Sequence, residues 1–264
     1  MKSSSNFGTV TAFAALFISL LRGVGASSFT ITPVADAFVT TGATGNFSGN
    51  NFGLAGALAI SAGGLPQGEF QSVLQFDLSG ARNSFDAQFG AGLWGIQSVT
   101  LKLTSSTHNN PIFNDIASGQ FNVSLMQNNS WVEGTGTGGI PTTDGISYNS
   151  LQNIYINNAA DQPLGSFSFP GGSSGANNYS LGLSSVLGAD LLLGSLLSLR
   201  LYAGDDHVSY LFSSRNAGAA VQPNLTIVAV PEPGTMAICV LGLATVSIWR
   251  VARRTTKRRP KHLS

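Results

Sequence analysis

The stretch Gln71–Ser79, QSVLQFDLS, indicates the fold more directly than any other part of the chain. Leu74 and Phe76 fall on one side of an extended backbone, whereas Gln75 and Asp77 fall on the other. Alternation with a period of two is typical of an antiparallel strand that buries one face and leaves the other in water. We therefore predict a half-buried strand here, with its apolar side chains directed at a core.

The same alternation recurs through the middle of the chain. It occurs in SVTLKLTS (98–105), QFNVSLMQ (120–127), LLSLRLYAG (196–204) and HVSYLFSS (207–214). Clusters of Gly, Asn and Ser between such stretches, as in 42–53 and 169–178, favour loops. Roughly nine to eleven antiparallel strands predict an all-β fold, a two-sheet β-sandwich of the jelly-roll type. The stretch 183–197 fits a strand least well, and its pattern leaves helix and strand open.

Charge is distributed unevenly along the 264 residues. Between Ser27 and Val230, four basic residues stand against eleven acidic ones, which gives this part a formal charge of −7. From Arg250 to the end, seven basic residues and no acidic one give +7. An acidic body argues against nucleic acid as a partner. The single cysteine, Cys239, excludes an intrachain disulfide and a cysteine-based metal site.

The first 26 residues have the three parts of a secretory signal peptide. Lys2 gives a positive start, the run Phe7–Leu21 is apolar and uncharged, and the small residues Gly25 and Ala26 follow. We predict export through the secretion translocon and cleavage by signal peptidase after Ala26. The alternative is a retained membrane anchor, which the short apolar run and the cleavage site disfavour.

The other end of the chain combines a rigid step, an apolar segment and a basic cluster. Each proline of Pro231-Glu232-Pro233 fixes its own φ and disfavours helix in the residue before it, so this step should be extended. We predict one transmembrane helix over 234–250, because the uncharged run 233–249 of 17 residues is just long enough to cross a bilayer core of about 30 Å. Basic residues after a span favour a cytoplasmic end, which places the body on the far side of the membrane. The topology residues are Arg250, Arg253, Arg254, Arg258 and Arg259.

This tripartite end, residues 230–259, resembles the PEP-CTERM sorting signal of Gram-negative bacteria. The resemblance implies that an exosortase-type membrane protease recognises Pro231, Glu232 and Pro233. It also implies that the helix and the arginines are discarded on processing. The alternative is an ordinary C-terminal membrane anchor that happens to follow two prolines.

The body also has landmarks in a recognisable order. They are VADAFVT (34–40), SVLQFDLS (72–79), IQSVTLKLTSS (96–106), NSWVEGTGTGG (129–139), GISYNSL (145–151), SYLFSSRNAG (209–218) and QPNLTIVAV (222–230). Over residues 27–229 they resemble the DNRLRE-type domain, a jelly roll similar to carbohydrate-binding modules. Gln71 or Ser72 stands where that family usually has an arginine before the FDLS strand, so ligand chemistry does not transfer with the fold.

Catalytic groups are sparse in the body. A hydrolase needs a nucleophile, a base and an orienting group, and the body has only two histidines, His108 and His207. Asp205 and Asp206 are able to hold His207 for acid–base work, but no nucleophile motif accompanies it, and a polar turn at a strand entry explains it better. His108 fits an exposed turn.

The acidic residues suit a cation better than a reaction. No spacing selects two carboxylates for glycoside cleavage. Calcium takes six to eight oxygen ligands from loop carboxylates and carbonyls, and Asp36, Asp205 and Asp206 are the residues that we select for a structural calcium ion. The alternative is that these are solvated loop acids. No other cofactor is expected.

Trp131, in NSWVEG, has two interpretations. Its ring can serve as a platform on which a sugar stacks, or it can be buried with Glu133 capping the turn. The sequence favours burial and keeps sugar stacking as the alternative.

Taken together, the patterns predict an exported, non-enzymatic protein of the cell surface or extracellular matrix of a Gram-negative bacterium, associated with exopolysaccharide or biofilm. Before processing it should be held in the inner membrane by the C-terminal helix, with the body in the periplasm. The alternatives are a carbohydrate-binding protein and, less well supported, a polysaccharide lyase or hydrolase.

Overall fold

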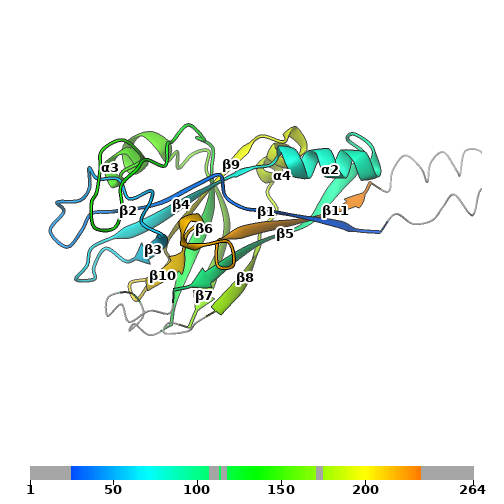
Figure 1. Cartoon of the computed structure of the whole chain (residues 1–264). Coiled ribbons are helices and arrows are strands. Elements are labelled where there is room, and N and C mark those ends of the chain that lie inside the picture. Colours follow the sequence, from blue (N-terminus) through cyan, green and yellow to red (C-terminus); the bar gives the residue numbers. More distant parts are fainter. Residues whose placement is uncertain (1–24, 107–112, 114–117, 171–174, 233–264) are drawn as a thin grey trace, which may run out of the picture. The chain divides into compact units, whose positions relative to one another are not determined.

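Antiparallel strands dominate the part of the chain that the computed structural model describes, residues 25–106, 113, 118–170 and 175–232 (Figure 1). In chain order the strands are β1 (Ser27–Ile31), β2 (Ala35–Thr40), β3 (Ala57–Ser61), β4 (Phe70–Asp77), β5 (Trp94–Ser105), β6 (Gly119–Met126), β7 (Gln162–Phe169), β8 (Gly175–Leu181), β9 (Leu196–Ala203), β10 (Ser209–Ser213) and β11 (Asn224–Pro231). The helical elements are short: α2 (Ser79–Phe89), α3 (Tyr148–Ser150), the π-helical turn η1 (Leu151–Tyr155), α4 (Ser185–Leu193) and the 3-10 turn η2 (Arg215–Ala217). The prediction of an all-β fold is confirmed.

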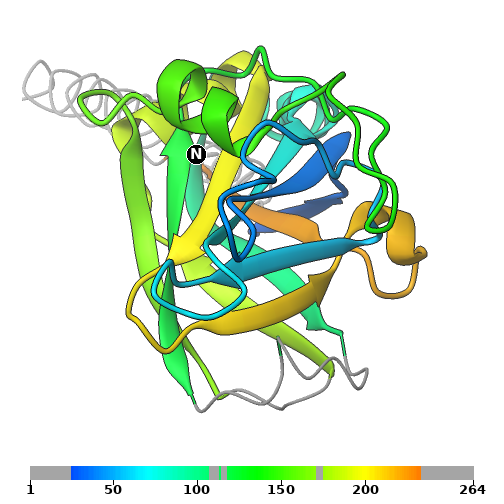
Figure 2. The same cartoon turned by 90° about the vertical axis from the view of Figure 1, so that its left-hand side faces the viewer.

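The strands follow one hydrogen-bonded path in the order β1-β11-β5-β10-β3-β4-β9-β6-β7, with β2 also paired to β4 and β8 to β5. Two joins on this path are narrow. In the strand register, β10 pairs with β5 at Phe212 opposite Ser105, and β3 pairs with β4 at Ser61 opposite Phe70. The sheet turns at these joins, and its halves enclose a common interior (Figure 2). The arrangement is β-sandwich-like.

One apolar core fills this interior. Leu101 and Ile227, on β5 and β11, come from one half of the sheet, while Phe76 and Leu199, on β4 and β9, come from the other. All four side chains are fully buried. Burial of each such side chain contributes about 1.5–3 kcal/mol, so the alternation in the sequence is what holds the two halves together.

The outer face of β4 is covered as well. The segment between β6 and β7 (residues 127–161, the β6–β7 segment) folds across it and forms a second, smaller core with Val73, Trp131 and Leu151. The prediction that Gln75 faces water is wrong, because this side chain is only 7% exposed. Alternation along one strand does not reveal that a distant segment covers its polar face.

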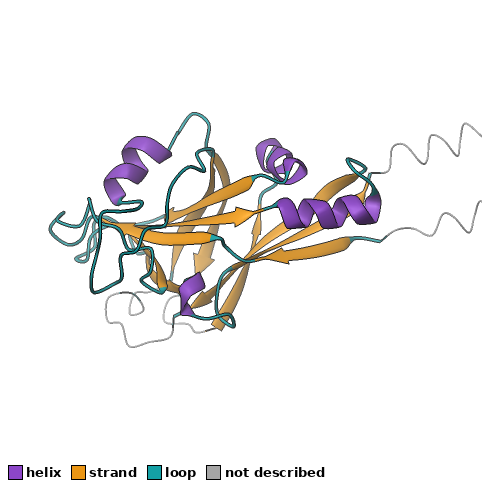
Figure 3. Cartoon of the chain, turned by 45° about the horizontal axis from the view of Figure 1, so that its top comes forward, coloured by secondary structure: helices purple, strands orange, loops and turns teal. Residues whose placement is uncertain are grey.

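The stretch 183–197, which the sequence left open, contains the helix α4. The Ser184 side chain caps the helix by accepting a hydrogen bond from the Leu187 N–H at 3.1 Å. Leu187 and Leu191, one turn apart, face the main core. The helix ends at Gly194, whose φ of 65° is left-handed and suits glycine. Figure 3 shows α4 and α2 as helices beside the strands.

The two ends of the compact unit Gly25–Val230 lie at the same edge of the sheet. β1 and β11 pair in antiparallel register, with Ser27 opposite Ala229 and Ile31 opposite Leu225. The first residue expected after signal-peptide cleavage therefore lies across from the end of the last strand.

Candidate functional site

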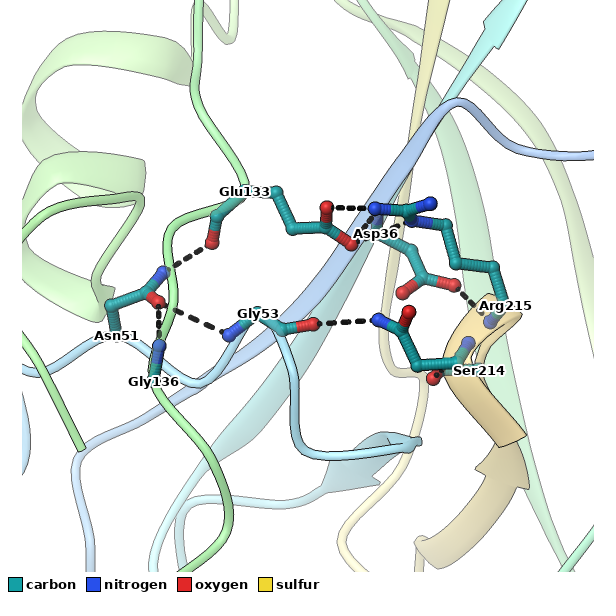
Figure 4. Close-up of polar contacts among 8 residues, drawn as sticks. Asp36, Asn51, Gly53, Glu133, Gly136, Ser214 and Arg215 are labelled. Atoms are coloured by element: carbon teal, nitrogen blue, oxygen red, sulfur yellow. Dashed lines mark hydrogen bonds and ion pairs between the residues drawn. The ribbon is translucent and has the colours of Figure 1, made fainter. Parts of the chain in front are cut away.

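The polar group that joins the most segments consists of Asp36, Asn51, Glu133 and Arg215, here called the buried polar network (Figure 4). Glu133 comes from the β6–β7 segment and Arg215 from the turn after β10. The Arg215 guanidinium donates through Nε to Glu133 Oε1 at 2.7 Å and through Nη2 to Glu133 Oε2. Such a bidentate pair fixes orientation as well as charge, so it locks the two segments together.

Asp36 lies on β2, beneath this ion pair, and is fully buried. Its Oδ2 accepts a hydrogen bond from the Arg215 backbone N–H at 2.7 Å. Its Oδ1 is buried and has no hydrogen-bond partner among the described residues. Burial raises the pKa of Asp36 to about 7, and the nearby Glu133 charge adds to the rise against the opposing hydrogen bond from Arg215.

Asn51 connects the network to three backbone segments. Its Nδ2 donates to the carbonyls of Glu133 at 2.6 Å and Ile146 at 2.9 Å. Its Oδ1 accepts from the N–H groups of Gly53 and Gly136, both at 3.1 Å. All the hydrogen-bonding capacity of the amide is therefore used. A Cβ at Gly136 would lie 1.9 Å from the Asn51 carbonyl oxygen, which explains a glycine at this position of the sequence.

These contacts separate Asp36 from the other acids selected for calcium. Asp205 and Asp206 lie with His207 in the turn between β9 and β10 (the β9–β10 turn), where one ligand atom of each falls within 4.8 Å of the others. Asp36 is not part of that group. The Glu133 carboxylate beside Asp36 is paired with Arg215, so the buried network contains an ion pair of the protein's own residues.

The β9–β10 turn is largely in water. The side chains of Asp206 and His207 are 86% and 69% exposed, and Asp206 Oδ1 lies 3.0 Å from His207 Nδ1. Asp205 accepts from the Gln120 N–H at 2.6 Å and from the His207 N–H at 2.9 Å. These are contacts that shape a turn before β10, in line with the interpretation of His207 as a strand-entry residue. His108 lies outside the described residues.

Trp131 is buried, with 4% of its surface exposed, and its Nε1 donates to Ser198 Oγ at 2.9 Å. Of the two interpretations of this residue, burial is the one that the structure shows. Its ring faces belong to the second core and are closed to a sugar. Glu133 does not cap the turn, because its carboxylate holds Arg215.

A polar group that the sequence analysis missed surrounds Gln71 on β4. Gln71 Oε1 accepts from Arg200 Nε at 2.7 Å, and Gln71 Nε2 donates to Glu69 at 2.5 Å. The Tyr148 hydroxyl donates to Glu69 at 2.6 Å, and burial together with this carboxylate raises the pKa of Tyr148 to about 12. The Arg200 guanidinium lies 4.2 Å from the centre of the Tyr202 ring. Arg200 is one of only four basic residues in the body, and that scarcity is a signal that the sequence did contain.

A surface hollow of about 610 Å³ lies where the β6–β7 segment begins and where η1 ends. Its lining consists of Gln127, Asn128, Asn129, Ser130, Ile154, Tyr155 and Asn157. None of these residues is charged, and four of the five polar residues other than Tyr155 carry an amide. No sequence motif pointed to this amide-lined hollow.

The hollow is held in shape by Asp161, which lies just outside the lining. Its two carboxylate oxygens accept hydrogen bonds from the N–H groups of Gln127 at 2.9 Å and Asn157 at 3.0 Å, one on each side of the hollow. Asn128 also reaches across, donating to the Ile154 carbonyl at 3.4 Å. A site whose walls are tied together loses little freedom when a ligand binds.

The predicted processing positions lie at the ends of the paired strands β1 and β11. Ala26 is exposed directly before β1. Pro231 is the last residue of β11, and Glu232 follows it as an exposed residue outside regular structure. Pro233, the predicted transmembrane helix over 234–250, the five topology arginines and Cys239 lie outside the described residues. Within the described ranges, no helix is long and apolar enough to cross a membrane.

Comparison with known proteins adds no relative. The sequence matches no protein-family model and no curated protein.

Proposed function

We propose that this protein is an exported, non-enzymatic component of the cell surface or extracellular matrix, sorted by an exosortase-type membrane protease. The observation that carries the proposal is the end of β11: the strand finishes at Pro231, and the next residue, Glu232, is exposed and outside regular structure. A protease needs such an accessible, extended peptide. The unit that remains has a full core of its own and does not depend on the discarded tail.

The proposal includes the finer assignments that the fold supports without establishing. The β-sandwich-like unit is a jelly roll of the DNRLRE type, and residues 230–259 are a PEP-CTERM signal. The chain enters the secretion translocon, loses its signal peptide after Ala26, and waits in the inner membrane of a Gram-negative bacterium with its body in the periplasm. Processing then releases or transfers it to the outer surface, where it joins the exopolysaccharide matrix.

Substitution of Glu232 tests the proposal in the native host. The mature wild-type protein should lack the arginine tail, whereas Glu232→Ala should retain it and stay with the inner membrane, as read by intact mass and fractionation. Asp206→Ala is the matched control, because it removes another exposed acid outside the motif and should process normally. A wild-type chain that keeps its arginines in the envelope would contradict the proposal.

A second function, glycan binding, is favoured by the amide-lined hollow. Amide groups offer both donors and acceptors, which is what sugar hydroxyls require, and Tyr155 contributes an aromatic surface beside them. The absence of charge in the lining selects a neutral sugar over an acidic one. The volume falls within the range of about 300–1,000 Å³ that small-molecule sites occupy.

This second function is tested by glycan-array binding of the exported protein. Tyr155→Ala and Asn157→Ala should each weaken binding to a neutral glycan by about tenfold, the loss of one good contact. Asn153→Ala is the matched control: it is an exposed amide on η1 that does not line the hollow. An array without any binder, or equal losses for all three variants, removes the glycan role.

A further inference from the structure

The last strand of the fold is an interior strand, which is unusual for the segment that leads into a processing motif. β11 lies between β1 and β5 in the sheet, so it has a hydrogen-bonded neighbour on each side. Its alternate residues Leu225, Ile227 and Ala229 are fully buried and belong to the main core. From Leu225 to Ala229 the backbone of β11 is paired with β1 and the inward side chains are buried, so this part of the strand is not available to another protein while the fold is intact.

Proteases generally bind a substrate as an extended segment whose free N–H and C=O groups pair with the enzyme. β11 has no free edge to offer. Resting on the proposed function, we propose that β11 withholds its own peptide bonds from the sorting protease, so that the bonds from Asn224 to Pro231 survive and the mature protein keeps Pro231. The sorting protease then recognises the chain from the end of β11 onward and not within β11.

The strand that closes β11 on its outer side is β1, the first segment after the signal peptide. Phe29 of β1 packs edge-on against Phe85 of α2, with ring centres 6.4 Å apart. Thr30 and Thr226 share a hydrogen bond of 2.8 Å between their side-chain oxygens at the surface. β1 pairs on one side only, because it is the end of the strand order. β1 is therefore the strand that has to detach from the sheet before the backbone of β11 becomes accessible.

The chemical step is cleavage of one peptide bond beyond Pro231. The C–N bond breaks, the acyl carbon takes the hydroxyl of a water molecule, and the departing amine takes the remaining proton. If an amine of an acceptor molecule replaces water, the acyl carbon bonds to that nitrogen instead and the same amine departs. The mass of the mature C-terminal peptide distinguishes the two cases, and both leave β11 complete.

The first experiment is peptide mapping of the mature protein purified from the native host. We expect a C-terminus at Pro231 or later, with the peptide through Pro231 intact. A C-terminus at Val230 or earlier overturns the inference while leaving the sorting proposal in place. A chain that still carries its arginines overturns the sorting proposal itself, and the inference with it.

The second experiment measures how fast a protease of broad specificity cleaves within β11. The full chain is used, in detergent. Cleavage within Asn224–Pro231 should be slow in the wild type and about tenfold faster in Phe29→Ala, because weaker docking of β1 raises the population with β11 open. Thr30→Ala is the matched control on the same strand, since it removes a surface hydrogen bond but no packing. Two results would contradict the protective role of β1. One is an equal rate of cleavage within β11 in the wild type and in Phe29→Ala, and the other is cleavage within β11 of the wild type as fast as cleavage at Glu232.

Discussion

The buried polar network and the β9–β10 turn use the same kinds of side chain, yet one is sealed inside the domain and the other stands in water. Asp36 in the network is fully buried, whereas Asp206 in the turn is 86% exposed. Burying a carboxylate is costly unless fixed groups replace the lost water. In the network, Glu133 pairs with Arg215 and Asp36 Oδ2 accepts from the Arg215 N–H, but part of the cost remains as the raised pKa of Asp36. The turn leaves its acids to the solvent. The same residue type therefore has a structural role in one place and little energetic weight in the other.

The difference is set by which segments cover each group. β2, the 51–53 loop, the β6–β7 segment and the turn after β10 all converge on the network. The β9–β10 turn bonds the backbone of Gln120 at the start of β6, and its Val208 carbonyl accepts from the Ala62 N–H after β3, but its acidic side chains have no such cover. The variants described next test whether the buried polar groups contribute more to stability than the exposed ones.

Asn51→Ala should have the largest effect. It leaves two carbonyls and two N–H groups without their partner in a buried place, and each unmade bond costs about 1–3 kcal/mol before relaxation. We expect a loss of at least about 3 kcal/mol in the free energy of unfolding, measured by urea titration. Asn51→Asp is the matched variant: it keeps the acceptor for Gly53 and Gly136 but directs a carboxylate at two carbonyls. Its stability should recover partly at low pH, and a pH-independent loss would contradict the assigned amide orientation.

Glu133→Ala should come second, because it leaves the Arg215 charge half-buried without its partner. The two side chains are 13% and 31% exposed, which places the pair between a surface and a fully buried ion pair, so we expect a loss of about 2–3 kcal/mol. A double-mutant cycle with Arg215→Ala measures the coupling itself. A coupling near zero would show that the network owes its stability to Asn51 alone.

The pH dependence of Asp36 should be next. The pKa of this carboxyl is about 7 in the folded protein and about 3.9 in an unfolded chain, so the folded state holds the proton more tightly. The stabilisation that comes from protonated Asp36 is complete below the pKa of the unfolded chain, and it is lost as pH rises through 7. Between pH 5 and 8 the loss should be about 2 kcal/mol. Asp36→Asn should flatten this slope in urea titrations, and an unchanged slope would assign it to other groups.

The contrast also shows what the sequence was able to predict. Strands were predictable because alternation follows from burial of one face, and Leu74 and Phe76 lie where the pattern placed them. The cover on the opposite face was not, since Gln75 is buried by residues more than 50 positions away. Alternation along a strand shows which face of the strand is buried against the main core. It carries no information about which distant segment covers the other face.

The roles of the candidate functional residues likewise depend on distant segments that local sequence does not reveal. Asp36 was selected because it is acidic, but its role comes from Glu133 and Arg215, which reach it from other segments. Asn51 was missed because nothing in GNNFG distinguishes one asparagine from its neighbours until the fold surrounds it. The amide-lined hollow was missed for the same reason, because its two sides are joined by the hydrogen bonds of Asp161 and Asn128, which form only in the fold.

The smallest effect is expected in the β9–β10 turn, and it decides whether that turn is only a turn. Asp206→Asn should leave Tm within about 1 °C of the wild type, because exposed ion pairs contribute little and their charges are screened. The turn offers two carboxylates, whereas calcium takes six to eight oxygens, so added calcium should leave Tm unchanged in both proteins. A calcium-dependent rise in Tm that Asp206→Asn abolishes would show that water and backbone carbonyls complete a site there. The exposed acids would then bear on stability after all, through a bound ion instead of through burial.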